Sequence, residues 1–250
     1  MSTPTLHVDG PLATLTLNRP QQANHLTVED LEQLSQHLQT LANRPEVRVL
    51  LLQAQGKHFC SGFDLSALSA VDAPALFERI VQQLAQLPQP RVAAINGGVF
   101  GGGTDLALAC DFRIGTTASR MFIPAARIGL HYHRGGMQRL VQQIGLSAAK
   151  RLLLTGEEFD AAAMLRCGFL DEVTPSNEAL GQRAQALCDT LCALAPLAVQ
   201  GMRRHLDAIA SGTLDSAQLE QDMARCRDSA DWAEGLLALQ ERRIPRFSGH

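Results

Sequence analysis

The residues best suited to chemistry lie in one glycine-rich stretch, from Ala93 to Asp111. An apolar run over residues 92–95 leads into five glycines within the seven residues 97–103, and a helical pattern begins near Leu106. Glycines this dense let the backbone approach a ligand closely. A helix start behind them directs free N–H groups at that ligand. The stretch is therefore suited to hold an oxyanion, although the same glycines could serve only to pack a helix against a strand.

A nucleotide-phosphate loop is a poorer interpretation of these glycines. Gly97 and Gly102 have the spacing of a Walker-type loop, but Gly103 stands where the lysine is needed, and no G-x-G-x-x-G series occurs. A second turn, residues 56–65, follows the apolar run 47–53 and also contains glycine. Two strand ends that each offer a backbone N–H could hold one carbonyl oxygen between them.

Seven short motifs resemble those of the crotonase, or enoyl-CoA hydratase/isomerase, superfamily, in order and over nearly the whole chain. They are Asn18-Arg19-Pro20 with Asn24, Phe59–Leu65, Asn96–Asp111, Gly129 with Gly135–Leu140, Leu154–Gly156, Gly168–Val173 and Glu241–Gly249. The resemblance implies an α/β fold, a spiral of ββα units with a helical C-terminal trimerisation region. We place the acyl-CoA-binding spiral core in residues 1–195 and the helical region in residues 196–250.

The resemblance also implies a ligand and the residues that hold it. The ligand is a coenzyme A thioester, bound as substrate with no further cofactor, and the protein forms a homotrimer or a dimer of trimers. By motif position, the two oxyanion-hole amides are those of Phe63 and Gly102. The residues implied to bind coenzyme A are Gln22, Ala23, Ser61, Asp64, Leu65, Arg242 and Arg243.

The chain departs from the pattern where hydratases of the superfamily use two glutamates. Asp105, one methylene shorter, stands at the first position, and Ala125, which cannot move a proton, stands at the second, after Pro124. We expect an apolar pocket to raise the pKa of Asp105, so that it works as a single acid or base. Alternatively, an aspartate in the first turn of a helix favours the helix dipole without any catalysis.

The segment after Gly129 contains the only tyrosine, Tyr132. Its spacing from Gly129 resembles that in the methylmalonyl-CoA decarboxylase branch, which implies a hydroxyl that orients a carboxylate or donates a proton. That branch has a histidine where this chain has Phe63, and Tyr132 could instead be a packed aromatic. His131 and His133 are two positions apart, so in an extended segment both side chains would face the same side, as a pair of metal ligands would. No third ligand is near in the sequence, so we predict no metal.

Three functions follow from these residues. The leading one is an enoyl-CoA hydratase/isomerase-type enzyme that stabilises an enolate, with Asp105 shuttling a proton in double-bond isomerisation or in slow hydration. The second is decarboxylation of a malonyl-type thioester, which needs no strong base and uses Tyr132. The third is an acyl-CoA-binding protein that has lost catalysis.

Composition excludes several other classes. The chain has 250 residues, 46% of them apolar, and a net charge of −3, which gives no general attraction to nucleic acid or anionic membranes. No apolar run reaches the 18 residues of a membrane span. The N-terminus lacks a signal-peptide pattern, and six scattered cysteines form no C-x-x-C pair, so we expect a cytoplasmic protein.

The elements that must position these residues alternate in the first half. We predict strands over residues 5–8, 13–17, 47–53, 92–95 and 112–115, and helices over 74–87 and 103–110 and after Thr27, with Leu31, Leu34, Leu38 and Leu41 as a buried stripe. This alternation predicts parallel strands with crossover helices. The second half predicts short strands near 119–123 and 170–174 and helices over 135–144, 147–154, 160–166, 177–194, 197–210, 216–229 and 231–241.

Overall fold

The apolar runs of the first half form a six-stranded sheet. The structure, a computed structural model, describes residues 3–63 and 73–250. The strands lie in the order β1 (Thr5–Asp9), β2 (Leu12–Leu17), β3 (Val49–Ala54), β5 (Arg91–Ile95), β7 (Phe112–Thr116) and β10 (Glu172–Thr174). Strands β1 and β2 form an antiparallel hairpin, and every later pair is parallel. The predicted α/β class is confirmed.

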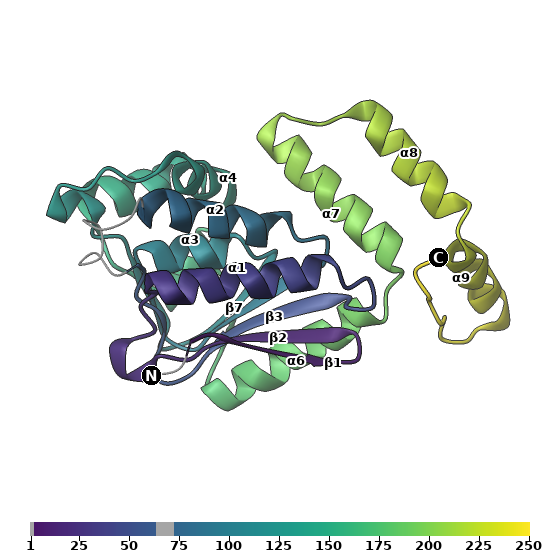
Figure 1. The fold of residues 1–250 in the computed structure, drawn as a ribbon, viewed down its shortest axis with the longest axis horizontal. Coiled ribbons are helices and arrows are strands. Elements are labelled where there is room, and N and C mark those ends of the chain that lie inside the picture. Colours follow the sequence, from purple (N-terminus) through teal and green to yellow (C-terminus); the bar gives the residue numbers. More distant parts are fainter. Residues whose placement is uncertain (1–2, 64–72) are drawn as a thin grey trace.

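Helices cover both faces of this sheet. Figure 1 shows α1 (Val28–Ala42) and α2 (Ala73–Gln86) on one side and α6 (Asn177–Cys192) on the other. Leu50 and Leu52 of β3 join the core beneath α1, while Val49 and Leu51 pack with α6. Alternate side chains of one strand point to opposite faces, which explains why a strand buried on both faces is a continuous apolar run.

Helix α1 forms as its sequence predicts. Thr27 accepts a hydrogen bond from the Asp30 amide while the Asp30 carboxylate accepts from the Thr27 amide, a complete capping box. The predicted apolar stripe faces the core, since each of its four leucines is at most 2% exposed. The predicted helix start and its buried face are therefore both confirmed.

A second sheet was not predicted. It contains β4 (His58–Cys60), β6 (Gly98–Phe100), β8 (Arg120–Phe122) and β9 (Phe159–Asp160), in that order. The sequence indicates only turns at the first two of these strands, and that interpretation is wrong. Strands of three residues or fewer show no alternation of polarity, and glycine inside β6 is unfavourable in a strand, so the pattern held no signal. Gly101, at φ 51°, is the one residue between β6 and α3 (Gly102–Leu108).

The second half is mostly helical, as predicted. Its remaining helices are η3 (Ala125–Ile128), α4 (Arg134–Lys150), η4 (Arg151–Thr155), α5 (Ala161–Arg166), α7 (Pro196–Ser211), α8 (Ser216–Arg227) and α9 (Ala230–Glu241). The first half also contains the short helix η1 (Pro20–Gln22). The helices predicted over 135–144 and 147–154 are one element with a kink at Gly145, followed by η4. Helices α7–α9 lie to one side of the core (Figure 1). The domain boundary near residue 195 stays a prediction.

Two findings bear on the function classes excluded by composition. None of the helices within residues 3–63 and 73–250 is long and apolar enough to cross a membrane. The same residues hold no group of three or more His, Cys, Asp or Glu side chains arranged to bind a metal ion. The cytoplasmic location stays a prediction.

The contact between α3 and β4 leaves no room for a side chain at Gly103. A Cβ atom there would lie 2.5 Å from the Cys60 carbonyl oxygen, a backbone atom that cannot move aside. We expect Gly103→Ala to lower the free energy of unfolding by about 1–3 kcal/mol, as overpacked cores do. The control is Gly181→Ala in α6, where a Cβ atom would meet nothing within 4 Å. This substitution should stabilise the helix by about 1 kcal/mol. Urea unfolding measures both, and equal effects would contradict this packing.

Candidate active site

A cavity lies where the two glycine-containing turns meet η3 and the segment before α4. From the turns, the described residues that line it are Ser61, Gly62, Phe63, Gly101 and Gly102. The other described lining residues are Pro74, Phe77, Ile123, Pro124, Ala125, Ile128, Leu130, His131, Tyr132 and His133. The lining is apolar except for backbone groups, one serine, two histidines and one tyrosine. Such a cavity suits an apolar group that has one polar centre to be held.

The two turns approach each other at backbone distance. A Cβ atom on Gly62 would lie 2.9 Å from the Gly102 amide nitrogen, and Gly62 itself has a φ of 97° that favours glycine. No described residue accepts a hydrogen bond from the amide of Phe63 or of Gly102. The structure thus brings Phe63 and Gly102 to one cavity. Their pairing as an oxyanion hole stays a prediction.

The Asn18-Arg19-Pro20 turn is fastened beside this cavity. The Asn24 side-chain amide donates to the carbonyl oxygens of Gln55 and His58, each at 2.8 Å. The Ser61 amide donates to the Ala23 carbonyl oxygen at 3.0 Å. Ala23 therefore lies next to a residue that lines the cavity, and Gln22, one residue earlier, is exposed to solvent.

Asp105 does not line the cavity. Its side chain is fully buried in α3, and the Arg139 guanidinium of α4 donates to both carboxylate oxygens, at 2.7 and 2.8 Å. Burial alone would raise the pKa of Asp105. The hydrogen bonds from Arg139, the contact with the His133 imidazole and the positive charges of both side chains outweigh burial and lower it. The predicted rise in the pKa of Asp105 is therefore wrong, because a cation that the local sequence does not show neutralises the carboxylate.

His133 links the buried carboxylate to the cavity. Its Nε2 atom is buried and lies 3.2 Å from Oδ2 of Asp105, close enough for an ion pair when the imidazole is protonated. Its Nδ1 atom accepts from the Gly136 amide at 3.3 Å and so caps α4, and it lies 3.6 Å from the Glu78 carboxylate. Burial alone would lower the pKa of His133, but Asp105 and Glu78 outweigh it and raise the value.

Tyr132 and Ala125 lie as their sequence positions indicate. The Tyr132 hydroxyl donates to the Gly101 carbonyl oxygen at 3.4 Å, next to the Gly102 amide. Burial, with the nearby charge of Asp105, raises the pKa of Tyr132 well above its ordinary value, so its hydroxyl stays neutral. Ala125 lines the cavity at the position of the second glutamate. The described lining therefore contains no carboxylate.

Some predicted residues lie elsewhere. Asp64 and Leu65 fall outside the described residues. Arg242 and Arg243 follow α9, which Figure 1 shows apart from α3 and α4 in the single chain. Arg243 pairs with Glu234 at 2.6 Å and with Glu241 at 2.6 Å, so its guanidinium is already engaged in this chain.

The comparisons with known proteins place the chain in a family. The sequence model of enoyl-CoA hydratase/isomerase matches residues 8–250. The chain belongs to this family. It is 32% identical to (E)-benzylidenesuccinyl-CoA hydratase of Thauera aromatica, over 98% of each chain, and 31% identical to 1,2-epoxyphenylacetyl-CoA isomerase of Escherichia coli, over 97% of each. The crystal structure of an enoyl-CoA hydratase from Bacillus anthracis matches with a TM-score of 0.90 at 29% identity, covering 100% of both chains. The predicted superfamily and crotonase-like fold are confirmed.

Sequence analysis missed three residues of this site. Arg139 lies within one of the motifs, yet nothing in the motif pairs it with Asp105, which is 34 positions earlier. The sequence indicates His133 only as one half of a possible metal pair, and it gives no signal for Glu78. The one usable signal was Asp105 itself, because a carboxylate on an apolar helix needs a buried partner.

We expect Asp105→Asn to lower the free energy of unfolding by about 3 kcal/mol at pH 7, since it leaves Arg139 buried without its partner. The control is Glu172→Gln, which breaks an equally bidentate but half-exposed pair with Arg183 and should change stability little.

The effect at Asp105 should depend on pH. Because the folded-state pKa of Asp105 is lowered, its stabilisation is present above the ordinary aspartate pKa and is lost as pH falls through the folded value. Denaturant unfolding at several pH values measures this. A constant difference between wild type and Asp105→Asn down to strongly acidic pH would contradict the ion pair.

Proposed function

We propose that this protein is an enzyme that acts on a coenzyme A thioester, and that the amides of Phe63 and Gly102 hold the thioester oxygen. The observation that supports this most is the backbone contact of the two glycine turns at one apolar cavity. Neither amide has an acceptor among the described residues, which is consistent with a role in holding a ligand. When a thioester forms an enolate, its carbonyl oxygen gains negative charge, which two fixed donors stabilise far better than mobile water.

The leading reaction is hydration or double-bond isomerisation of an enoyl-CoA substrate. Either one requires proton transfer at the carbon next to the thioester. The relatives include both a hydratase and an isomerase, so their names alone do not choose between the two. In this proposal Asp105 stays ionised and acts through the side chains that it holds, rather than by carrying the proton itself. Its burial and its bond to Arg139 keep it out of reach of the substrate.

Decarboxylation of a malonyl-type thioester is the second candidate, and one observation favours it. The described cavity lining holds proton donors but no carboxylate base. In decarboxylation the bond between the α-carbon and the carboxylate breaks, its electron pair forms the enolate, and carbon dioxide leaves without removal of a proton. The enolate then needs only a donor, and the neutral Tyr132 hydroxyl lies beside the Gly102 turn.

The ends of the coenzyme are assigned from motif position. Gln22 and Ala23 would hold the adenine end, and Ser61, Asp64 and Leu65 would bind other parts of the coenzyme; the hydrogen bond from the Ser61 amide to the Ala23 carbonyl oxygen supports a shared site for these two residues. Arg242 and Arg243 would reach the phosphates from a neighbouring subunit, since neither lines the cavity and α9, which they follow, lies apart from α3 and α4.

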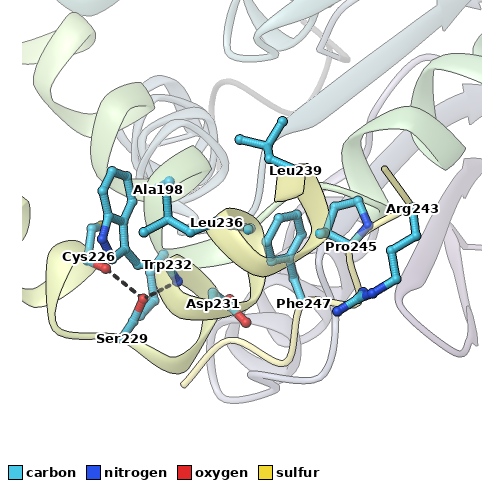
Figure 2. A pocket seen from close by; sticks show the side chains of 14 residues that line it. Ala198, Cys226, Ser229, Asp231, Trp232, Leu236, Leu239, Arg243, Pro245 and Phe247 are labelled. Carbon is cyan, nitrogen blue, oxygen red and sulfur yellow. Dashed lines mark hydrogen bonds between the residues drawn. The ribbon is translucent and has the colours of Figure 1, made fainter. Parts of the chain in front are cut away.

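We also propose a homotrimer, alone or as a dimer of trimers, with α7–α9 in the subunit contacts. Helix α8 buries no residue of its own. An apolar cavity of about 400 Å³ lies between α7, α9 and the C-terminal tail. Figure 2 shows Trp232, Leu236 and Phe247 among its lining side chains. Leu239 is 78% exposed in the single chain. Apolar surface on this scale indicates a protein interface.

Gly102→Pro tests the oxyanion hole. Gly102 is the first residue of α3, where proline is tolerated because its missing N–H has no helical partner. We expect kcat to fall about 10²–10³-fold, as on loss of one oxyanion donor, on whichever thioester wild type converts in a panel of enoyl-CoA and substituted malonyl-CoA compounds. Mass spectrometry of the products shows which reaction occurs.

The matched control is Gly102→Ala, which adds the same Cβ at 3.0 Å from the Phe77 ring but keeps the amide. It should retain most of the activity. Equal losses in the two variants would remove the Gly102 amide from the mechanism. Acyl-CoA binding without conversion of any panel member would instead favour a binding protein.

Leu239→Asp tests the subunit contact. We expect wild type to sediment as three chains of 27.0 kDa, or six, and the variant to shift toward smaller species because a charge enters the apolar contact. The control is Gln240→Asp, which adds the same charge at the next, already polar, exposed position of α9. A monomeric wild type, or unchanged assembly in Leu239→Asp, contradicts the assignment.

A further inference from the structure

The cavity at the two glycine turns is small. It has a volume of about 150 Å³, and a dry apolar cavity of about that size holds one molecule of benzene. Both glycine turns belong to its lining, so a thioester whose carbonyl oxygen is held there leaves space for a single compact group. Apolar side chains make up most of the described lining, so that group is apolar as well.

Phe77 of α2 bounds the cavity next to the Gly102 turn. The tip of its ring points at this turn, since a Cβ atom on Gly102 would lie 3.0 Å from Cζ and 3.4 Å from Cε1 and Cε2 of the ring. The Phe77 side chain is 5% exposed and packs in the hydrophobic core, which fixes its position. An acyl group whose carbonyl oxygen accepts from the Gly102 amide would therefore begin beside this ring tip.

A second aromatic contact and a buried ion pair support the Phe77 ring. The ring centroid lies 6.0 Å from that of His133, edge to face, and Tyr132 packs against the same imidazole at 4.9 Å. His133 in turn contacts the buried pair of Asp105 and Arg139, neither of which lines the cavity. An apolar chain could pass the ring only by separating these charges from their partners, which is costly. The cavity is therefore closed on the side of α2 and α4.

Ala125 gives the cavity part of its room. It is buried in η3 and lines the cavity, and its side chain is a single methyl group. A larger side chain at this buried position would take up space that a ligand could otherwise use. The capacity of the cavity thus depends on one large side chain, Phe77, and on one small one, Ala125.

We propose that Phe77 is a specificity-determining residue that, together with Ala125, limits the acyl group of the substrate to a chain of about six carbons or to a single ring. This inference rests on the proposed thioester function. It names the substrate class as short-chain or monocyclic acyl-CoA and sets long-chain acyl-CoA aside. It applies equally to hydration, isomerisation and decarboxylation, because in each of them the two amides hold the same thioester oxygen beside the same ring.

The test is binding of saturated straight-chain acyl-CoAs, from acetyl-CoA to dodecanoyl-CoA, measured by isothermal titration calorimetry with free coenzyme A as the reference. These thioesters have no double bond to hydrate or shift, so the test needs no knowledge of the natural reaction. In wild type, affinity should rise about fourfold for each methylene group that enters the cavity. The rise should end at a chain of about six carbons, because further methylene groups find no room in the cavity.

Two substitutions should move this limit in opposite directions. Phe77→Leu removes the ring tip beside Gly102 but keeps an apolar core residue, so the rise in affinity should continue to longer chains. Ala125→Leu fills the cavity, so hexanoyl-CoA should lose about tenfold or more in affinity while acetyl-CoA changes little. The matched control is Phe112→Leu in β7, whose ring packs on the α6 side of the large sheet and which should bind the whole series as wild type does. A purely structural role of Phe77 would weaken all chain lengths equally.

The outcomes are distinct. Affinity that still rises up to dodecanoyl-CoA in wild type, or a limit that Phe77→Leu leaves unmoved, overturns the role of Phe77 and leaves the thioester function standing. The same holds if acyl-CoAs bind no more tightly than free coenzyme A although wild type converts a member of the acyl-CoA panel. Absence of binding by every acyl-CoA, together with absence of turnover on that panel, overturns both.

Discussion

The candidate site depends on a steric constraint between two segments of backbone. The turn after β4 and the turn after β6 touch at Gly62 and Gly103, where a Cβ atom would lie 2.9 Å from the Gly102 amide nitrogen and 2.5 Å from the Cys60 carbonyl oxygen. Only glycine permits this approach at these two positions. Because the two turns end neighbouring parallel strands of the second sheet, both line the same cavity. The large sheet and its helices hold these short strands in register, which two or three residues alone could not do.

The electrostatics of the site differ from those that the sequence motifs predict. Where hydratases of the superfamily are expected to present two glutamates, this chain has Ala125 in the cavity and Asp105 behind it. Asp105 is neutralised by Arg139 and so cannot move a proton easily, but its charge still acts on its neighbours. It keeps the Tyr132 hydroxyl neutral and favours protonation of His133. Because Asp105 holds its negative charge outside the cavity, the ionisable side chains of the described lining are proton donors.

The sequence predicted well those features that depend on neighbours along the chain. Thr27 with the leucine stripe of α1, and the apolar run of β3, follow from local periodicity and were found where expected. The motifs also identified the family and singled out Phe63 and Gly102, and the structure places both of these residues at one cavity. The second sheet escaped prediction because β4 and β6 are too short for periodicity. The pKa of Asp105 was predicted in the wrong direction because its partner Arg139 comes from another helix, and Glu78, 57 residues before Gly135, is equally invisible to any local pattern.

The account's central claim is that two backbone amides polarise a thioester carbonyl. Isotope-edited infrared difference spectroscopy of butanoyl-CoA, labelled with ¹³C at the carbonyl, measures that polarisation on binding. The account predicts that the carbonyl stretch shifts to lower frequency in the complex, because both amides donate to the oxygen. A bound thioester whose carbonyl frequency equals that in water would contradict it.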